Sequence, residues 1–148
     1  MTKKTFHLRE ISYDDWEILL EWRNEKETRN NSINSNIIQE DEHKDFIKKI
    51  IKDSEKNQFI FEYNEKPVGT IREDLLGEDQ FELSYTINPK YRGMKIGQIM
   101  MHLYLIERKG SFFCEVKEKN IPSIKMIEKL GFKLFKKDNQ INLYKLDK

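Results

Sequence analysis

The spacing of apolar residues along the chain predicts alternating strands and helices. Short runs of β-branched and aromatic residues, several of them alternating with polar residues, predict strands. These runs cover residues 6–11, 58–63, 67–72, 81–88, 111–117, 132–137 and 140–146. Apolar residues recur about every 3.6 positions in four other segments, which predicts helices. These segments cover residues 12–29, 39–56, 96–108 and 120–130.

Capping and turn residues mark where these elements are expected to begin and end. Ser12, with Asp15 three residues later, forms a helix start, and the Asn-rich residues 30–36 are expected to end that first helix. Gly131 is expected as the residue that terminates the last helix. Turns are expected at residues 64–66, 75–80 and 138–139.

Apolar stripes identify the faces that two of the predicted helices bury. The stripe of the second helix consists of Phe46, Ile47, Ile50 and Ile51, and that of the third consists of Ile96, Ile99, Met100, Leu103 and Ile106. His43 lies at the edge of the first of these stripes, so packing is its expected role. Trp22 and Cys114 are also expected in the core.

The predicted elements follow the order β-α-α-β-β-β-α-β-α-β-β. This order fits neither a doubly wound fold nor a sandwich. It predicts a mixed α/β (α+β) fold, in which a mostly antiparallel sheet of about seven strands carries about four helices on its faces. The chain of 148 residues has no internal repeat, linker or low-complexity tract, so we expect a single domain over residues 1–148.

Composition narrows the class of protein. Charged residues make up 36% of the chain, and acids and bases nearly cancel to a net charge of +1. A nucleic-acid-binding domain normally carries a clustered basic excess, so nucleic acid is not an expected partner. No segment reaches the length of a membrane span, and the single cysteine fits a reducing compartment. We therefore expect a cytoplasmic protein without a membrane partner.

Residues 85–98 have the pattern of an anion-binding turn. A predicted strand meets Pro89 and Gly93, and a helical pattern begins at Ile96. The amides of a helix's first turn and the positive end of its dipole attract anions. Arg92 and Lys95 add full positive charges at this point. The pattern alone also fits an ordinary connection between a strand and a helix.

Three features together resemble the Gcn5-related N-acetyltransferase (GNAT) family. The segment Arg92-Gly93-Met94-Lys95-Ile96-Gly97 resembles the family's loop Arg/Gln-x-x-Gly-x-Gly/Ala. The order of elements is similar over the whole chain, and residues 120–132 resemble the segment Asn-x-x-Ala/Ser-x-x-x-Tyr-x-Lys-x-Gly-Phe. Residues 22–43 resemble the family's branches in nonulosonate (pseudaminic acid) biosynthesis and in acetylation of ribosomal-protein N-termini.

Lys95 stands where the GNAT family usually has a glycine. A left-handed backbone at this position would be strained for lysine, whereas a helical backbone would not. Because the residue is expected in the first helical turn, we predict the ordinary helical conformation for it.

The resemblance implies that acetyl-CoA is the cosubstrate and that it binds where two parallel central strands, residues 81–88 and 111–117, splay apart. Backbone groups of the first strand would bind pantetheine, and the loop amides would bind the pyrophosphate. The implied coenzyme-binding residues are Tyr85, Thr86, Ile87, Arg92, Gly93, Met94, Lys95, Ile96, Gly97, Gln98, Asn120, Ser123 and Lys129. A helix cap is the alternative role for Asn120, and a solvated surface position is the alternative for Lys129.

Acetyl transfer to an amine needs a base for the amine and a proton for the leaving thiolate. Glu82 is the candidate base, acting directly or through a water held by Ser84 on the same strand face. A solvated carboxylate is the alternative for Glu82, and Glu73 and Asp74 are weaker candidates. The family's usual acid is a tyrosine at the position of Ile127, so another group, water or an unaided thiolate must replace it.

The first two helices and their connection read the acceptor in this family, so the resemblance implies that Arg23, Asn24 and Arg29 bind it. The two arginines can hold a sugar-nucleotide diphosphate through forked hydrogen bonds. Salt bridges at helical spacing are the alternative use of these arginines, with Glu21, Glu25 and Glu27 as the partners.

The leading hypothesis is an acyltransferase, an acetyl-CoA-dependent N-acetyltransferase that acts on a primary amine of a small molecule. A nucleotide-linked amino sugar is the first expected acceptor, and N-terminal (ribosomal-protein) or polyamine acetylation are the alternatives. A non-catalytic acyl-CoA-binding module is the alternative from another class, and Ile127 in place of tyrosine favours it. No metal site is expected, and a homodimer is left open.

Overall fold

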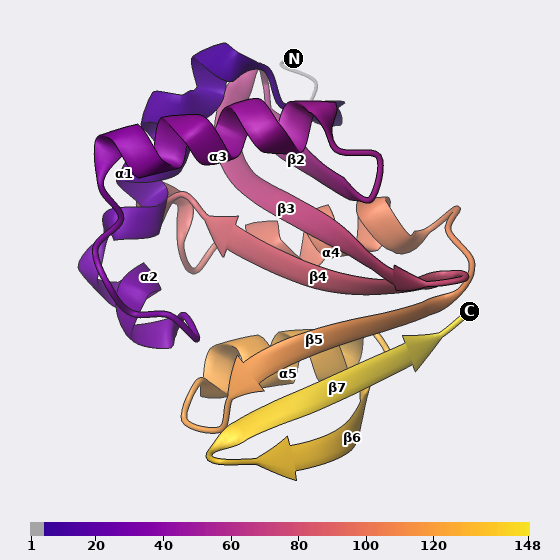
Figure 1. The fold of residues 1–148 in the computed structure, drawn as a ribbon. Coiled ribbons are helices and arrows are strands. Elements are labelled where there is room, and N and C mark those ends of the chain that lie inside the picture. Colours follow the sequence, from indigo (N-terminus) through magenta and orange to yellow (C-terminus); the bar gives the residue numbers. More distant parts are fainter. Residues whose placement is uncertain (1–4) are drawn as a thin grey trace.

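The computed structural model describes residues 5–148, which form a seven-stranded sheet with helices on both faces (Figure 1). The strands are β1 (Phe6–Glu10), β2 (Lys56–Tyr63), β3 (Lys66–Gly77), β4 (Gln80–Ile87), β5 (Ser111–Lys117), β6 (Lys133–Asp138) and β7 (Ile141–Asp147). The helices are α1 (Trp16–Asn24), α2 (Lys26–Asn31), α3 (Glu40–Lys52), α4 (Ile96–Leu105) and α5 (Ile121–Lys129), with short 3-10 helices at Tyr13–Asp15 and Pro89–Tyr91. The spatial order is β1-β2-β3-β4-β5-β7-β6, and β4 and β5 are the parallel pair of this described sheet. The predicted mixed α/β fold is confirmed, with five α-helices in the described residues instead of about four.

Alternate residues of the strands supply two cores, one on each face of the sheet. Ile60 of β2 packs with Trp22 of α1 and Ile47 of α3. The next residue, Phe61, belongs to the larger core that also contains residues of α4 and α5. Successive strand side chains point to opposite faces, so α1 and α3 cover one face while α4 and α5 cover the other (Figure 1). The predicted core positions of Trp22 and Cys114 are confirmed.

The first helix begins where the sequence predicts and ends earlier than predicted. Ser12 and Asp15 form the expected capping box, in which the Ser12 N–H donates to the Asp15 carboxylate at 2.8 Å. The helix breaks at Glu25, whose backbone is extended, and not within residues 30–36. The Glu25 carboxylate accepts from the Thr28 N–H at 2.9 Å and so caps a separate short helix, α2.

The buried face of α3 is narrower than the predicted stripe. His43, Ile47 and Ile50 are buried at spacings i, i+4 and i+7, whereas Ile51 is 45% exposed because it falls outside this face. His43 packs as expected. Its Nε2 lies 3.0 Å from the Trp16 carbonyl oxygen, and burial lowers the pKa of its imidazole.

The buried face of α4 also differs from the predicted stripe. Met100, Met101 and Tyr104 are buried, whereas Leu103 and Ile106 are exposed. Nearly every residue of this helix is apolar, so the sequence pattern alone does not define which side packs on the sheet. None of the helices within residues 5–148 is long and apolar enough to cross a membrane.

Strand pairing moves two of the predicted turns. The hairpin turn at residues 64–65 is confirmed, and both residues have positive φ. Residues 75–77, predicted as part of a turn, instead extend β3 against β4 with an irregularity in register, so the turn lies at residues 78–79. The last hairpin turns at residues 139–140 and not at 138–139. Gly131, at φ 102°, terminates α5 as predicted. The N–H of the next residue, Phe132, donates back to the Ile127 carbonyl in the last turn of the helix.

The two parallel strands in the middle of the sheet separate after a short paired stretch. Residues 80–82 of β4 pair with residues 111–113 of β5. Beyond Glu82, the edge of β4 that faces β5 has no strand partner within the described residues. Figure 1 shows the two strands diverging towards the side where α2 lies. The backbone edge of β4 that faces β5 is therefore unpaired beyond this point, where the sequence predicts the coenzyme, and this separation of the two strands is called the opening below.

Candidate active site

The turn between β4 and α4 presents a row of free backbone amides. The first hydrogen bond of α4 runs from the Ile99 N–H to the Lys95 carbonyl oxygen at 3.2 Å. Within residues 5–148, no acceptor is bonded to the amides of residues 93–98. A left-handed residue followed by a helical one turns successive N–H groups into an anion-binding concavity. This donor set fits the pyrophosphate of a coenzyme A thioester.

Lys95 has the backbone conformation that the sequence analysis predicted it to avoid. Its φ of 61° and ψ of 19° are left-handed, so the predicted helical conformation is wrong. The reason is that α4 begins at Ile96 and Lys95 is its N-cap. A left-handed conformation costs a non-glycine residue about 1–2 kcal/mol, so the turn carries strain at this position.

The two glycines of the turn serve different purposes. Gly93 has a φ of 78°, which glycine adopts without a steric penalty. Gly97 is buried, and a Cβ there would lie 2.9 Å from Met126 Sδ and 3.5 Å from Ile87 Cγ1. Its missing side chain therefore lets α4 approach α5 and β4 closely, which fixes the orientation of the free amides.

Arg92 was expected to add a free positive charge at the turn, but its charge is paired with carboxylates. Its guanidinium forms ion pairs with Glu25 at 2.5 Å and with Glu27 at 2.7 Å. It also donates to the Thr28 hydroxyl at 3.0 Å. The Arg92 partner lowers the pKa of the Glu25 carboxyl to about 2. Arg92 thus fastens α2 to the turn that follows β4.

Helix α5 places two of the three predicted contact residues at the opening. The Asn120 side chain accepts from the Ser123 N–H at 3.4 Å, so Asn120 caps α5, the alternative role predicted for it. The Ser123 hydroxyl is hydrogen-bonded to the Tyr85 hydroxyl of β4. Ile127, one turn later, is fully buried. Lys129 is exposed in the last turn of α5, away from the helix N-terminus.

Glu82 lies on the face of the sheet that α1 and α3 cover, next to other charged residues. It pairs with Asp74 of β3 in register, and Ser84 pairs with Arg72. Burial raises the pKa of the Glu82 carboxyl above its ordinary value; the carboxylates of Glu115 and Asp74 act in the same direction, and Arg72 opposes them. A carboxylate with a raised pKa is a stronger base for an amine proton.

Glu73, one of the weaker candidate bases, is engaged on the opposite face. It is buried, and its carboxylate accepts from Asn57 Nδ2 at 3.1 Å and from Arg108 at 2.8 Å. The Tyr104 hydroxyl donates to it as well. These bonds occupy both carboxylate oxygens, which assigns Glu73 a structural role. Asp74 lies on the Glu82 face but is held by Arg72 at 3.3 Å.

Arg23 and Arg29 do not form the predicted salt bridges within residues 5–148. Arg23 donates to the Ser32 hydroxyl at 3.3 Å and to the Asn34 carbonyl at 2.5 Å. Arg29 donates from Nε to the Asn24 carbonyl at 3.0 Å. The alternative with Glu21, Glu25 and Glu27 is therefore wrong, since Arg92 takes the last two of these carboxylates.

Arg23 lies in a positively charged environment. It is half-buried, and burial lowers the pKa of its guanidinium. The nearby charges of Arg72 and Arg29 lower that pKa further. Asn24 does not contribute to this charge; it holds the following loop through two bonds to the Ile38 backbone, at 2.8 Å and 2.9 Å. The positive charges of these arginines favour an anion near α1 and α2.

Helix α2 borders the opening and contacts both of its walls. Arg92, after β4, holds the first turn of α2. The Lys117 ammonium, at the end of β5, donates to the Asn30 carbonyl of α2 at 2.8 Å. Sequence reasoning missed this helix and the roles of Arg72, Glu115 and Lys117, because the relevant partners are far apart along the chain. Strand alternation was the one signal that could place Arg72 beside Ser84.

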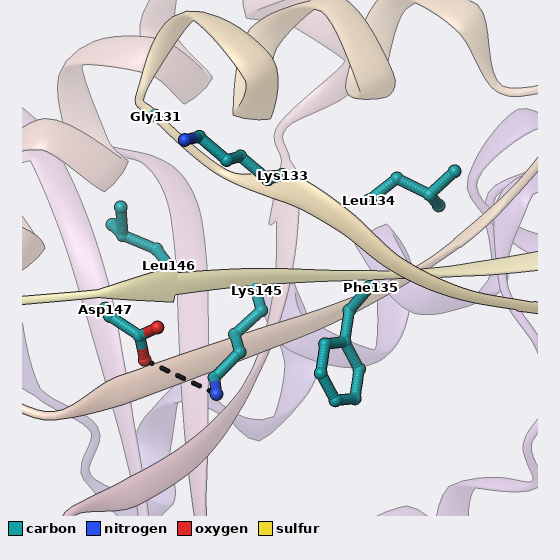
Figure 2. Close-up of a pocket in the computed structure, with 7 residues that line it drawn as sticks. All are labelled: Gly131, Lys133, Leu134, Phe135, Lys145, Leu146 and Asp147. Atoms are coloured by element: carbon teal, nitrogen blue, oxygen red, sulfur yellow. Dashed lines mark ion pairs between the residues drawn. The ribbon is translucent and has the colours of Figure 1, made fainter.

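One open hollow on the described surface lies elsewhere. It is an open pocket of about 370 Å³ in the β6–β7 hairpin, lined by Gly131, Lys133, Leu134, Phe135, Lys145, Leu146 and Asp147 (Figure 2). Two of these residues, Lys145 and Asp147, form an ion pair at 3.6 Å (Figure 2). None of the predicted site residues lines it, so it does not belong to the opening between β4 and β5. The described residues also contain no cluster of side chains suited to a metal ion.

Family comparison assigns the class of protein. The model of the acetyltransferase (GNAT) family matches residues 16–132. The chain therefore belongs to this family, as the sequence motifs predicted. It is an N-acetyltransferase that uses acetyl-CoA. No curated protein sequence matches the chain.

Solved structures share this fold at low sequence identity. A domain from Methanocaldococcus jannaschii DSM 2661 superposes with a TM-score of 0.83 at 24% identity, over 99% of this chain and 100% of that one. Campylobacter jejuni N-acetyltransferase PseH in complex with acetyl coenzyme A has a TM-score of 0.75 at 20% identity, over 97% and 99%. Vibrio cholerae spermidine N-acetyltransferase in complex with CoA and spermine has a TM-score of 0.80 at 14% identity, over 95% and 92%.

Proposed function

We propose that the enzyme acetylates the primary amine of a small anionic molecule, and that a nucleotide-linked amino sugar is the leading acceptor. The observation that carries this proposal is the proximity of Arg23 to Arg29 and to Arg72, of which Arg72 also pairs with Asp74 at 3.3 Å. Arg23 and Arg29 have no carboxylate partner within the described residues. Guanidinium groups bind phosphate through two parallel hydrogen bonds, so a diphosphate suits them.

The charge pattern distinguishes this acceptor from the alternatives. A polyamine carries a positive charge at each amine, and the arginine group would repel it. The likeness to PseH and to spermidine N-acetyltransferase leaves both acceptor classes open, because identity is low in both cases. A peptide N-terminus remains the second alternative, although nothing in the arrangement of Arg23, Arg29 and Arg72 favours it.

The residues near Glu82 support catalysis over simple coenzyme binding. Acetyl-CoA supplies the activated acetyl group. Glu82, directly or through a water held by Ser84, accepts the proton of the amine. Backbone groups of Tyr85, Thr86 and Ile87, beyond the part of β4 that pairs with β5, would orient the thioester. A non-catalytic acyl-CoA-binding module would not need a carboxylate whose pKa is raised by burial and by Glu115. The free thiol of buried Cys114 supports a cytoplasmic location for this reaction.

Release of the coenzyme thiol tests the proposed acceptor. The panel should contain a nucleotide-diphosphate 4-amino sugar, the same amino sugar without the nucleotide, spermidine and a short peptide. We expect the nucleotide-linked sugar to give the highest kcat/KM. Preference for spermidine or the peptide would contradict the proposed acceptor, and silence on every amine together with tight acetyl-CoA binding would favour the binding module.

A substitution separates the anion site from general effects of the arginines. Arg23→Gln should raise the KM for the nucleotide-linked sugar about tenfold or more and leave the affinity for acetyl-CoA unchanged. Its effect on an uncharged amine should be small. Arg9→Gln is the matched control, because Arg9 of β1 pairs with Asp15 of the first 3-10 helix and with Glu62 of β2, away from β4 and β5. An equal effect of Arg23→Gln on charged and uncharged amines would contradict a role in anion binding.

A further inference from the structure

The opening between β4 and β5 carries a polar side-chain pair on the face covered by α4 and α5. The Tyr85 hydroxyl is hydrogen-bonded to the Ser123 hydroxyl and so links β4 to the first turn of α5. Tyr85 lies three residues beyond Glu82, the last residue of β4 that pairs with β5. The pair therefore lies where the two strands have already separated.

The surroundings of this pair keep the phenol protonated. Tyr85 packs against the larger core, which includes Cys114 and Ile127. Burial raises the pKa of the Tyr85 phenol above its ordinary value, and the nearby Cys114 acts in the same direction. A neutral phenol donates a hydrogen bond, and Ser123 can both accept one and donate one. The pair therefore joins a buried donor on β4 to the partly exposed start of α5.

Thioester cleavage creates a demand for such a donor. When the carbon–sulfur bond breaks, its electron pair remains on sulfur, and a hydrogen-bond donor or acid stabilises the thiolate. Ile127 has no proton to give. Cys114 is fully buried and its thiol pKa is raised by burial, while Glu73 is held by Tyr104 and Arg108. Tyr85 is the hydroxyl on this face that borders the separated strands.

We propose that Tyr85 donates a hydrogen bond to the leaving thiolate and that Ser123 positions the phenol for this contact. As the carbon–sulfur bond breaks, its electron pair stays on sulfur, and the Tyr85 hydroxyl stabilises the negative charge without losing its own proton. Water then protonates the sulfur. The proton that Glu82 removes from the amine returns to solvent, so the net change is one proton lost by the amine and one gained by the thiol. This inference rests on the acetyl-transfer function, but not on the identity of the acceptor.

The pKa of bound coenzyme A tests the proposal without any acceptor. A donor that stabilises the thiolate lowers the pKa of the bound thiol, which ultraviolet absorbance follows during a pH titration. We expect Tyr85→Phe to weaken the acid dissociation of this thiol about tenfold, which is one pKa unit. Calorimetry should show that the variant still binds coenzyme A. Tyr63→Phe is the matched control, because Tyr63 stacks on Phe6 away from the opening.

Turnover and a second pair of variants complete the test. With any amine that serves as a substrate, Tyr85→Phe should lower kcat about 10²-fold without raising the KM for acetyl-CoA. Ser123→Ala should raise the pKa of the bound thiol, and Ser123→Thr should restore it because threonine keeps the hydroxyl. If Tyr85→Phe does not fold, the Ser123 variants decide. The same thiol pKa in wild type, Tyr85→Phe and Ser123→Ala would overturn the proposed role of the Tyr85–Ser123 pair while leaving the acetyltransferase function intact.

Discussion

Lys95 shows how one backbone angle sets the geometry of the turn between β4 and α4. Its left-handed conformation starts α4 and turns the amides of residues 93–98 outward. Glycine adopts this conformation freely, whereas lysine is strained in it. The strain persists because Gly97, the second residue of α4, lets the helix pack closely against Met126 and Ile87, and this packing fixes where the helix begins.

Replacing Lys95 with glycine is therefore expected to stabilise the protein. Lys95→Gly should have a free energy of unfolding about 1 kcal/mol higher than Lys95→Ala, because only glycine relieves the left-handed strain. Both variants lose the ammonium, so the comparison isolates the backbone. Urea denaturation measures the difference. Equal stability of the two variants would mean that the turn relaxes without strain.

Glu82 is the second residue whose role depends on its neighbours. Burial, Glu115 and Asp74 raise the pKa of its carboxyl, and only the deprotonated form accepts the amine proton. We expect kcat/KM to fall as the pH falls through this raised pKa. Glu82→Gln should lower kcat about 10²–10⁴-fold and abolish that acidic limb, with coenzyme affinity unchanged.

A matched variant distinguishes the base from a surface carboxylate. Glu115→Gln removes a charge that raises the pKa of Glu82, so it should move the acidic limb to lower pH while activity is retained. Rate measurements across the acidic range, with one acceptor well below its KM so that they report kcat/KM, follow both variants. A pH–rate profile of Glu82→Gln that matches wild type would exclude Glu82 as the base.

At the scale of elements, α2 connects the two walls of the opening. This helix has only six residues, and none of them is buried. It is held instead by Arg92 through Glu25 and Glu27, and by the bond from Lys117 to the Asn30 carbonyl. A helix this short is not stable on its own, so these contacts determine its position between the ends of β4 and β5.

Acid should weaken the attachment of α2. The folded-state pKa of Glu25 is about 2, below the ordinary value of 4.5. Its ion pair with Arg92 therefore contributes fully to stability at a pH above 4.5. This contribution is lost as the pH falls towards about 2. The difference in unfolding free energy between wild type and Glu25→Gln should therefore shrink over this range. Glu21→Gln, which removes an exposed carboxylate of α1, is the control. A difference that stays constant with pH would rule out the Arg92 ion pair as its cause.

At the scale of the whole molecule, a buried polar network ties the sheet to α4. The Glu73 carboxylate of β3 binds Asn57 of β2, Tyr104 of α4 and Arg108 beyond it. The Arg108 guanidinium also stacks on the Tyr104 ring at 4.1 Å. These contacts lie at the end of α4 opposite the free amides. They therefore support this helix without contacting the turn of residues 93–98.

Removing the charge of Glu73 should cost stability and spare coenzyme binding. Glu73→Gln leaves Arg108 without its carboxylate and should lower the free energy of unfolding by about 2 kcal/mol. Glu78→Gln, in the exposed turn after β3, is expected to change it by less than about 0.5 kcal/mol. Thermal or urea unfolding gives these values, and calorimetry gives the affinity for acetyl-CoA. A loss of affinity in a folded Glu73→Gln variant would contradict a purely structural role.

The sequence by itself determined the order of the strands, four of the five described α-helices, the fold class and the position of the turn between β4 and α4. These features follow from local signals: the alternation of apolar residues, the capping pair of Ser12 and Asp15, and the terminating Gly131. The motifs at residues 92–97 and 120–132 indicated the family, because each is a contiguous stretch that is recognised from the sequence alone.

Only the tertiary structure decided which residues from distant parts of the sequence contact each other. The partner of Arg92, the opposite faces of Glu73 and Glu82, and the contact of Tyr85 with Ser123 all join segments far apart in the sequence. The left-handed Lys95 likewise depends on where α4 packs, which Met126 and Gly97 set. Pairing and packing across the sheet are long-range effects, so a local pattern can place these residues on an element but not choose their partners.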